Sequence, residues 1–348
     1  MCKPRFWLTA SALLAWSLLA ACSRQPGSSE DPAAAARVEV ATSADQGGAV
    51  SAAQVEAKPV PADVMSGTNW PPAQLGAGEA WIGCSADASE TDNGQPLHSL
   101  EFFALVDALT PCRDAGVVRL RYVGKIDAGF TALVERVAAM ATRMDIDTRL
   151  LDIDSAGGQV EDAMRAGDAI GAAHWAIQVG DQAVCHSACV LVLAAGDTRT
   201  IAGKVGIHRM VRIGSTATSR RELSQELRDV YAQMKDYLER NGAAVAVADL
   251  MMTVPNRQLR ILGDGELAQF GLQGTNAAQD DLERIQLTRK CGDEFVRRKD
   301  AFAQAFDAEC ATPKQALEAM NDCGIALRER FGFPDAKCPS EGPLARYQ

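Results

Sequence analysis

Short apolar runs alternate with stretches of helical periodicity through the middle of the chain, and this alternation limits the fold more than any other feature. Strands are expected at 117–123, 149–153, 175–179 and 205–208, and helices at 128–144, 160–173, 187–195 and 219–240. Such alternation is typical of parallel strands joined by right-handed crossovers. The sequence predicts an α/β fold, with a mostly parallel sheet flanked by helices and a site at the carboxyl ends of the strands.

Two segments at predicted strand ends carry residue types that perform chemistry. Ser155-Ala156-Gly157-Gly158 follows one strand, and glycines in such a turn let backbone N–H groups approach a ligand closely. Cys185-His186-Ser187-Ala188-Cys189 opens a helix, and Gly206-Ile207-His208 follows further along the chain. A Ser at a strand-to-helix turn with a downstream His can serve as the nucleophile and base of acyl transfer. Together the segments predict a serine hydrolase.

Each of these residues also has a purely structural interpretation. Ser187 suits the N-cap of a helix, because a Ser side chain accepts hydrogen bonds from the first turn. Glycine pairs relieve backbone strain in many short turns, and a single His208 can be structural. The common order and spacing of the segments favour the hydrolase. His186 is not assigned as the base, because neighbours on a helix do not face each other.

The order of strands, helices and these segments resembles the proteolytic subunit of the Clp protease and the wider Clp/crotonase superfamily. The resemblance implies a Clp/crotonase-like fold, with Ser187 as nucleophile and His208 as general base. It also implies an oxyanion hole formed by the N–H groups of Gly157 or Gly158 and of Ala188. The Cys-x-Ser-Ala-Cys and Gly-Ile-His-Arg segments are similar to those of periplasmic relatives of that protease.

The resemblance covers 117–273 and departs from the family at its third catalytic residue, an Asp. Leu259 stands at that position, and no carboxylate lies between Leu250 and Gly263. Asn256 or Gln258 could orient the imidazole through a side-chain carbonyl, as an Asn does in papain-like enzymes. A neutral group stabilises the imidazolium less than a carboxylate does, so a slow enzyme or none is expected. The long helix after His208 corresponds to the family's inter-ring handle and is compatible with a homo-oligomer.

The N-terminus resembles that of an exported lipoprotein. Lys3 and Arg5 precede the apolar run 6–21, which is short for a membrane span and typical of a signal peptide, expected at 1–21. Leu19-Ala20-Ala21-Cys22 resembles a bacterial lipobox, which implies lipid attachment at Cys22, and the following Ser implies the outer membrane. The alternative is an ordinary cleavage site followed by a Cys by chance.

The cysteines fit an oxidising compartment. Of the 10 Cys, Cys2 leaves with the signal and Cys22 would carry lipid, so an even number remains for disulfides. These are Cys84, Cys112, Cys185, Cys189, Cys291, Cys310, Cys323 and Cys338. Proximity along the chain suggests Cys84 with Cys112 and the last four among themselves, whereas Cys185 and Cys189 could bond to each other or elsewhere. No Cys-x-x-Cys pair occurs and the chain has 4 His, so neither a metal nor another cofactor is expected.

Composition divides the mature chain into three parts. Residues 22–79 are rich in Ala, Ser, Gly and Pro and are expected to form a disordered tether. A Clp/crotonase-like domain is expected at 80–275. A disulfide-stapled helical extension is expected at 276–348, with helices at 279–307 and 313–331.

Charge and compartment limit the partners. The net charge of -10 becomes -12 once the signal and its two cations are removed, which argues against nucleic acid and anionic lipid headgroups. The expected partners are a peptide or protein substrate and the membrane through Cys22, with no ATPase partner outside the cytoplasm. The main alternative is a noncatalytic, lipid-anchored binding or assembly protein that keeps the fold, which the missing Asp favours.

Overall fold

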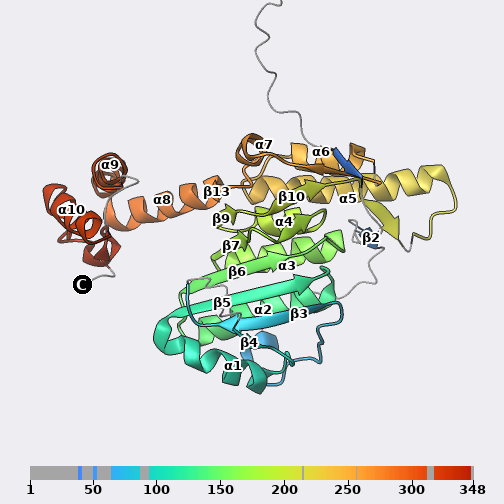
Figure 1. Ribbon diagram of the computed structural model, residues 1–348, viewed down its shortest axis with the longest axis horizontal. Helices are drawn as coiled ribbons and strands as arrows, with labels where there is room; N and C mark the ends of the chain where they lie inside the picture. The colour runs from blue at the N-terminus through green and yellow to red at the C-terminus, as the bar shows by residue number, and fades with distance from the viewer. Residues whose placement is uncertain are drawn as a thin grey trace, which may run out of the picture. The chain divides into compact units, whose positions relative to one another are not determined.

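A seven-stranded sheet forms the centre of the fold in the computed structural model (Figure 1). The model describes residues 38–40, 50–52, 64–86, 94–213, 215–255, 257–311 and 317–345. In order across the sheet, the strands are β13 (Gly274–Thr275), β9 (Thr198–Ile201), β7 (Trp175–Val179), β6 (Thr148–Asp154), β5 (Val117–Gly124), β3 (Gly78–Gly83) and β4 (Gln95–Pro96). The four central strands pair in parallel and the outer three in antiparallel. The predicted α/β class, with a mostly parallel sheet, is confirmed.

A second, four-stranded sheet contains the strands that lead into Ser187 and His208. Its order is β1 (Val38–Val40), β12 (Gln258–Ile261), β10 (Lys204–Ile207) and β8 (Val184–His186). β8 and β10 are parallel, and β12 is antiparallel to β10 and β1. A further parallel pair joins β2 (Val50–Ala52) to β11 (Val211–Ile213). The strand expected at 205–208 therefore exists, but it lies in this smaller sheet rather than in the central one.

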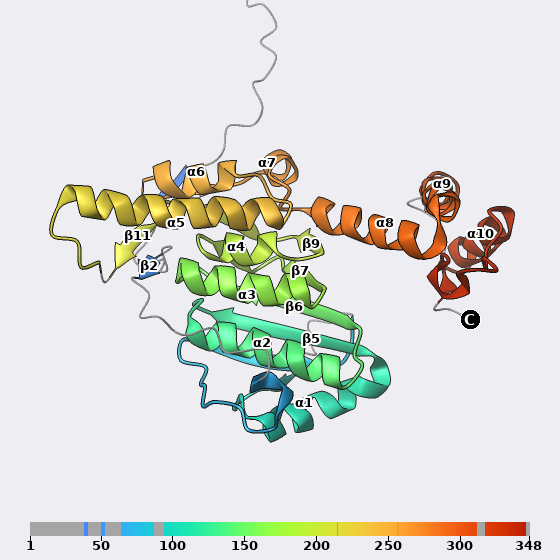
Figure 2. The ribbon, with the colours of Figure 1, turned by 180° about the vertical axis from the view of Figure 1, so that it is seen from behind.

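Helices cover the sheets, and helix α3 lies beside both α2 and α4 (Figures 1 and 2). The helices of the α/β part are α1 (Phe102–Ala115), α2 (Ala128–Arg143), α3 (Val160–Ala172), α4 (Cys189–Ala194), α5 (Arg220–Arg240), α6 (Ala246–Thr253) and α7 (Asp264–Gln269). Side-chain caps fix two of the starts: Asp127 accepts from the Phe130 N–H at 3.0 Å, and Ser219 accepts from the Glu222 N–H at 3.2 Å. No described helix is both long and apolar enough to cross a membrane.

The folded region begins further toward the N-terminus than residue 80, where the sequence placed the start of the domain. After a 3₁₀ turn, η1 (Val64–Ser66), the Trp70 side chain is 8% exposed and packs edge-on against Phe102, with 5.2 Å between ring centroids. The Arg136 guanidinium lies 5.6 Å from the Trp70 ring centroid. Part of the segment assigned to a tether thus belongs to the core. The Trp70 contacts help to hold this segment, although the composition averaged over the tether is poor in apolar residues.

The C-terminal part forms a helical segment with an apolar cluster of its own. Its helices are α8 (Ala277–Cys291), α9 (Asp293–Glu309) and α10 (Leu317–Arg330), followed by a 3₁₀ turn, η2 (Pro339–Glu341). The helix expected at 279–307 is divided in two at Gly292, which has a φ of 94°. A glycine adopts this conformation without a steric penalty, which ends the first helix.

Four disulfides are present among the described residues. Cys84 bonds to Cys112 with 4.5 Å between Cα atoms, which ties the end of β3 to α1, as the sequence suggested. The last four cysteines pair among themselves, as expected: Cys291 with Cys338 and Cys310 with Cys323. Cys185 and Cys189 bond to each other, with 5.2 Å between Cα atoms.

The disulfide between Cys84 and Cys112 should contribute strongly to stability. It closes a loop of sequence separation 28, and Cys112 is fully buried. We expect Cys84→Ala/Cys112→Ala to lower the free energy of unfolding by about 2 to 5 kcal/mol, because the unfolded chain gains freedom. Urea unfolding of the wild-type protein and of the double variant, without reductant, measures the difference. An unchanged unfolding midpoint would show that this bond adds nothing to the fold.

Candidate functional site

The Gly-Gly turn lies where the two sheets meet. Ser155, at the end of β6, bridges to Cys185 of β8: the Ser155 N–H donates to the Val184 carbonyl at 2.7 Å, and the His186 N–H donates to the Ser155 carbonyl at 2.9 Å. The turn is thereby held against the strand that leads into Ser187. Topology, rather than sequence proximity, brings the two predicted segments together.

The backbone conformation of this turn requires a glycine at both positions. Gly157 has a φ of 106°, a region that other residues rarely adopt. Gly158 crosses Ile126 so closely that a Cβ atom there would overlap the Ile126 carbonyl oxygen. Ile126 and Gly158 form a parallel bridge, in which the Ile126 N–H donates to the Gly157 carbonyl at 3.0 Å.

The two glycine N–H groups differ in their hydrogen bonding. The Gly157 N–H donates to Ser155 Oγ at 3.1 Å. Among the hydrogen bonds of the described residues, none has the Gly158 or the Ala188 N–H as its donor, although both residues are buried. Unpaired buried N–H groups are rare in folded proteins. Of the alternatives Gly157 and Gly158, only the second has an N–H without an acceptor among the described residues.

Ser187 occupies a tight turn between β8 and α4. Its φ is 61°, in the left-handed region, and its N–H donates to the Gly206 carbonyl at 2.7 Å. The disulfide between Cys185 and Cys189 closes this turn from both ends. The helix expected from residue 187 begins at Cys189 instead, with Ala188 as its N-cap, because the left-handed residue cannot be part of it. Ser187 is fully buried.

His208 follows the strand beside the one that precedes Ser187. Gly206 of β10 stands opposite His186 of β8 in the parallel register, so Ser187 and His208 come directly after adjacent strand ends. His208 is 5% exposed, and its Nδ1 lies 3.2 Å from the Arg209 carbonyl oxygen. An Nδ1–H that donates to this carbonyl leaves the Nε2 lone pair as the base.

The sequence predicted that Asn256 or Gln258 would orient the His208 imidazole. In the structure, the backbone carbonyl of Arg209 contacts its Nδ1 instead. Asn256 lies outside the described residues, and Gln258 is exposed on β12. Leu259, at the position of the family's Asp, is 3% exposed and packs over Gly206. His186 also packs over Gly206, and it belongs to β8 rather than to a helix.

One ion-pair network links the segment after His208 to the helix after the Gly-Gly turn. Arg212 of β11 contacts Glu161, in the first turn of α3, at 3.0 Å, and Glu226 of α5 at 3.1 Å. Burial raises the pKa of the neighbouring Asp162 carboxyl. Sequence reasoning missed this network, since nothing in the spacing of the three charged residues indicates that they meet.

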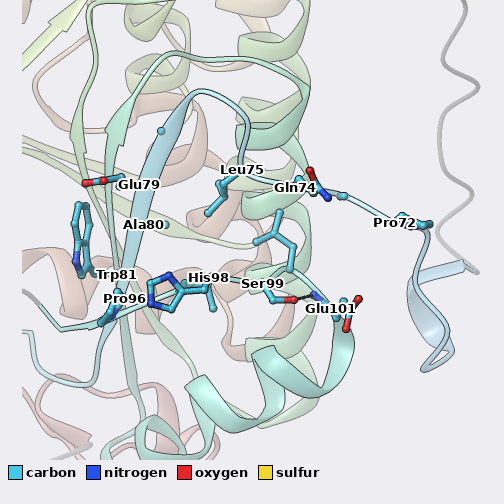
Figure 3. A pocket seen from close by; sticks show the side chains of 14 residues that line it. Pro72, Gln74, Leu75, Glu79, Ala80, Trp81, Pro96, His98, Ser99 and Glu101 are labelled. Carbon is cyan, nitrogen blue, oxygen red and sulfur yellow. Dashed lines mark hydrogen bonds between the residues drawn. The ribbon is translucent and has the colours of Figure 1, made fainter.

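The described residues contain no group of three or more His, Cys, Asp or Glu that could hold a metal ion. A cavity of about 530 Å³ lies along β3 and the segment after β4 (Figure 3), and none of the predicted catalytic or oxyanion residues lines it.

Comparison with known proteins gives a partial likeness of fold. No family model matches the chain, and no curated protein matches it. Among solved structures, it is similar to an alanine mutant of the membrane-bound stomatin-specific protease 1510-N and to a second alanine mutant of that protease in complex with a substrate peptide. Each is 14% identical with a TM-score of 0.35 and covers 48% of this chain, which corresponds to 81% and 76% of the two structures.

The close crossing of Gly158 and Ile126 generates a stability prediction. We expect Gly158→Ala to lower the free energy of unfolding by about 2 kcal/mol or more, because the new methyl group overlaps backbone atoms that cannot move freely. Gly180→Ala is the matched control, since a Cβ at Gly180 meets no atom within 4 Å. Urea unfolding measures both variants, and equal midpoints would contradict the described geometry of the turn.

Proposed function

We propose that this protein is a serine hydrolase of the cell envelope, most consistent with a peptidase, which acts through an acyl-enzyme. The observation that carries the proposal is that no hydrogen bond among the described residues has the N–H of Gly158 or of Ala188 as its donor, although both residues are buried. His208 follows the adjacent strand end. These are the parts that acyl transfer requires: a hydroxyl, a base and donors for an oxyanion.

In the proposed mechanism, Ser187 Oγ attacks an ester or amide carbonyl while His208 Nε2 takes its proton. The Gly158 and Ala188 N–H groups bind the developing oxyanion, and each such donor contributes about 3 to 4 kcal/mol to the transition state in enzymes of this kind. The imidazolium then protonates the leaving group. Water, activated by the same imidazole, hydrolyses the acyl-enzyme and restores the Ser187 hydroxyl.

The group that orients His208 sets an upper limit on the rate. The Arg209 carbonyl holds the imidazole and fixes its tautomer, but it carries no full charge with which to stabilise the imidazolium. The Arg209 N–H donates to the Val254 carbonyl at 2.6 Å, which anchors this stretch of backbone to the end of α6. In this proposal His208 is a base with a fixed tautomer and weak activation.

Two observations favour the second candidate, a noncatalytic binding or assembly protein. The Ser187 side chain has no exposed surface, so a substrate carbonyl reaches it only after a covering segment moves. Leu259 stands where the family has a carboxylate, and this difference also favours a noncatalytic protein. The two candidates differ in one measurable property, the reactivity of the Ser187 hydroxyl.

Activity-based labelling tests the hydrolase. We expect the purified domain to react with a fluorophosphonate probe, Ser187→Ala to abolish the reaction, and His208→Ala to slow it about 100-fold or more because the general base is lost. Ser224→Ala, which removes an exposed hydroxyl on α5, is the control. Absence of labelling in the wild-type protein, or persistent labelling of Ser187→Ala, would leave the noncatalytic candidate.

We also propose that the chain is exported and lipid-anchored at Cys22, on the periplasmic side of the envelope and at the outer membrane. Cys22 and the predicted signal lie outside the described residues. The four disulfides support the proposal, since such bonds persist in oxidising compartments. The proposal also includes a peptide or protein substrate, assembly as a homo-oligomer, and no ATPase partner.

Metabolic labelling tests the anchor. In bacteria given an alkyne fatty acid, we expect the full-length protein to acquire the label and Cys22→Ser to lose it, because the acylated thiol is gone. Cys2→Ser is the matched control and should keep the label, since that residue leaves with the signal. Equal labelling of the two variants would place lipid attachment elsewhere or exclude it.

A further inference from the structure

The outer edge of β3 is only half covered. On one side β3 pairs with β5 along its whole length, from Gly78 to Gly83. On the other side β4 pairs with it only at Trp81 and Ile82. The Leu97 N–H then donates to the Ala80 carbonyl at 2.8 Å, and no described strand pairs with this edge beyond that bond.

The alternation of antiparallel pairing shows which backbone groups face the uncovered half. Ala80 bonds outward to Leu97, whereas the Ala77 carbonyl bonds inward to the Lys125 N–H at 2.9 Å. Successive residues of such a strand point their N–H and C=O groups to opposite sides. Gly78, two residues from Ala80, therefore directs its N–H and C=O outward. An exposed edge of this kind is a template for an added strand.

A cavity of about 530 Å³ lies along this uncovered half (Figure 3). Its walls are the segment 72–75, the β3 edge from Gly78 to Trp81, and the segment 96–101. Leu75 and Leu97 supply apolar surface, and Figure 3 shows Trp81 and Pro96 at the same end of the cavity. The cavity thus combines an unpaired strand edge with apolar walls, which is the combination that extended peptides bind.

The charges that line the cavity select the kind of peptide. Glu79 and Glu101 line it and are exposed, and neither has an ion-pair partner among the described residues. No Lys or Arg lines the cavity; Arg121, whose guanidinium lies over the Trp81 ring, is not among the lining residues. A segment with basic side chains is therefore complementary to the site.

We propose that the uncovered half of β3 and this cavity form a binding site for an extended basic peptide segment, which adds to the sheet as a strand. A second copy of this chain fits less well, since symmetric pairing of two β3 edges would bring acidic side chains together and each copy carries a net charge of -10. The peptide site does not rest on the proposed hydrolase, because none of its residues belongs to the Ser187 segment or to the Gly-Gly turn.

Fluorescence anisotropy with a labelled peptide of alternating Lys and Val tests the site, on the Ser187→Ala protein so that cleavage cannot interfere. Two variants with the same change in charge are compared: Glu79→Lys/Glu101→Lys in the cavity, and Asp107→Lys/Asp114→Lys on the exposed face of α1. We expect the first to weaken binding about tenfold or more and the second to change it less than about twofold.

A peptide with Pro at every second position separates strand addition from charge attraction, because it lacks the N–H groups that the Gly78 carbonyl would accept. We expect it to bind at least about tenfold more weakly than the Lys-Val peptide. Equal binding of the two peptides, equal loss in both charge variants, or no binding at all would each overturn the proposal. So would a protein that sediments as a dimer in the Ser187→Ala form and as a monomer in Glu79→Lys/Glu101→Lys, which would make a second copy the occupant.

Discussion

The contact between the end of β6 and β8 is the interaction on which the candidate site depends. Two main-chain hydrogen bonds, from the Ser155 N–H to the Val184 carbonyl and from the His186 N–H to the Ser155 carbonyl, join the central sheet to the smaller one. Main-chain bonds of this kind set distance and direction together. They hold the Gly-Gly turn against the strand that leads into Ser187, together with a bond from the Val184 N–H to Asp154 Oδ1 at 3.0 Å.

Much of the fold could be predicted from the sequence, because hydrophobic periodicity reports which side of an element is buried. The strand expected at 175–179 is β7 residue for residue, and the helix expected at 128–144 is α2 with one residue fewer. The failures have local causes. Gly292 divides one expected helix, and Trp70 anchors a segment whose overall composition suggested a tether. Periodicity also could not assign the strand before His208 to the smaller sheet, since pairing partners are set by tertiary contacts.

The candidate site could be predicted in its residue types but not in its details. Ser187, His208 and the glycine turn stand at strand ends, as the alternation of elements implied. The contact to the imidazole comes from a carbonyl of the main chain, which every residue has and which no pattern of side chains reveals. The choice between the N–H groups of Gly157 and Gly158 likewise depends on where Ser155 Oγ lies, which the sequence does not reveal.

The disulfide that encloses Ser187 makes this turn sensitive to the redox state of its surroundings. Cys185 and Cys189 are both fully buried, and the bond between them spans only the residues of the turn. In a compartment that keeps thiols reduced, the turn would fold without this crosslink and the left-handed serine would lose its tether. Oxidising surroundings therefore add a covalent constraint to the Ser187 turn, and reducing surroundings remove it.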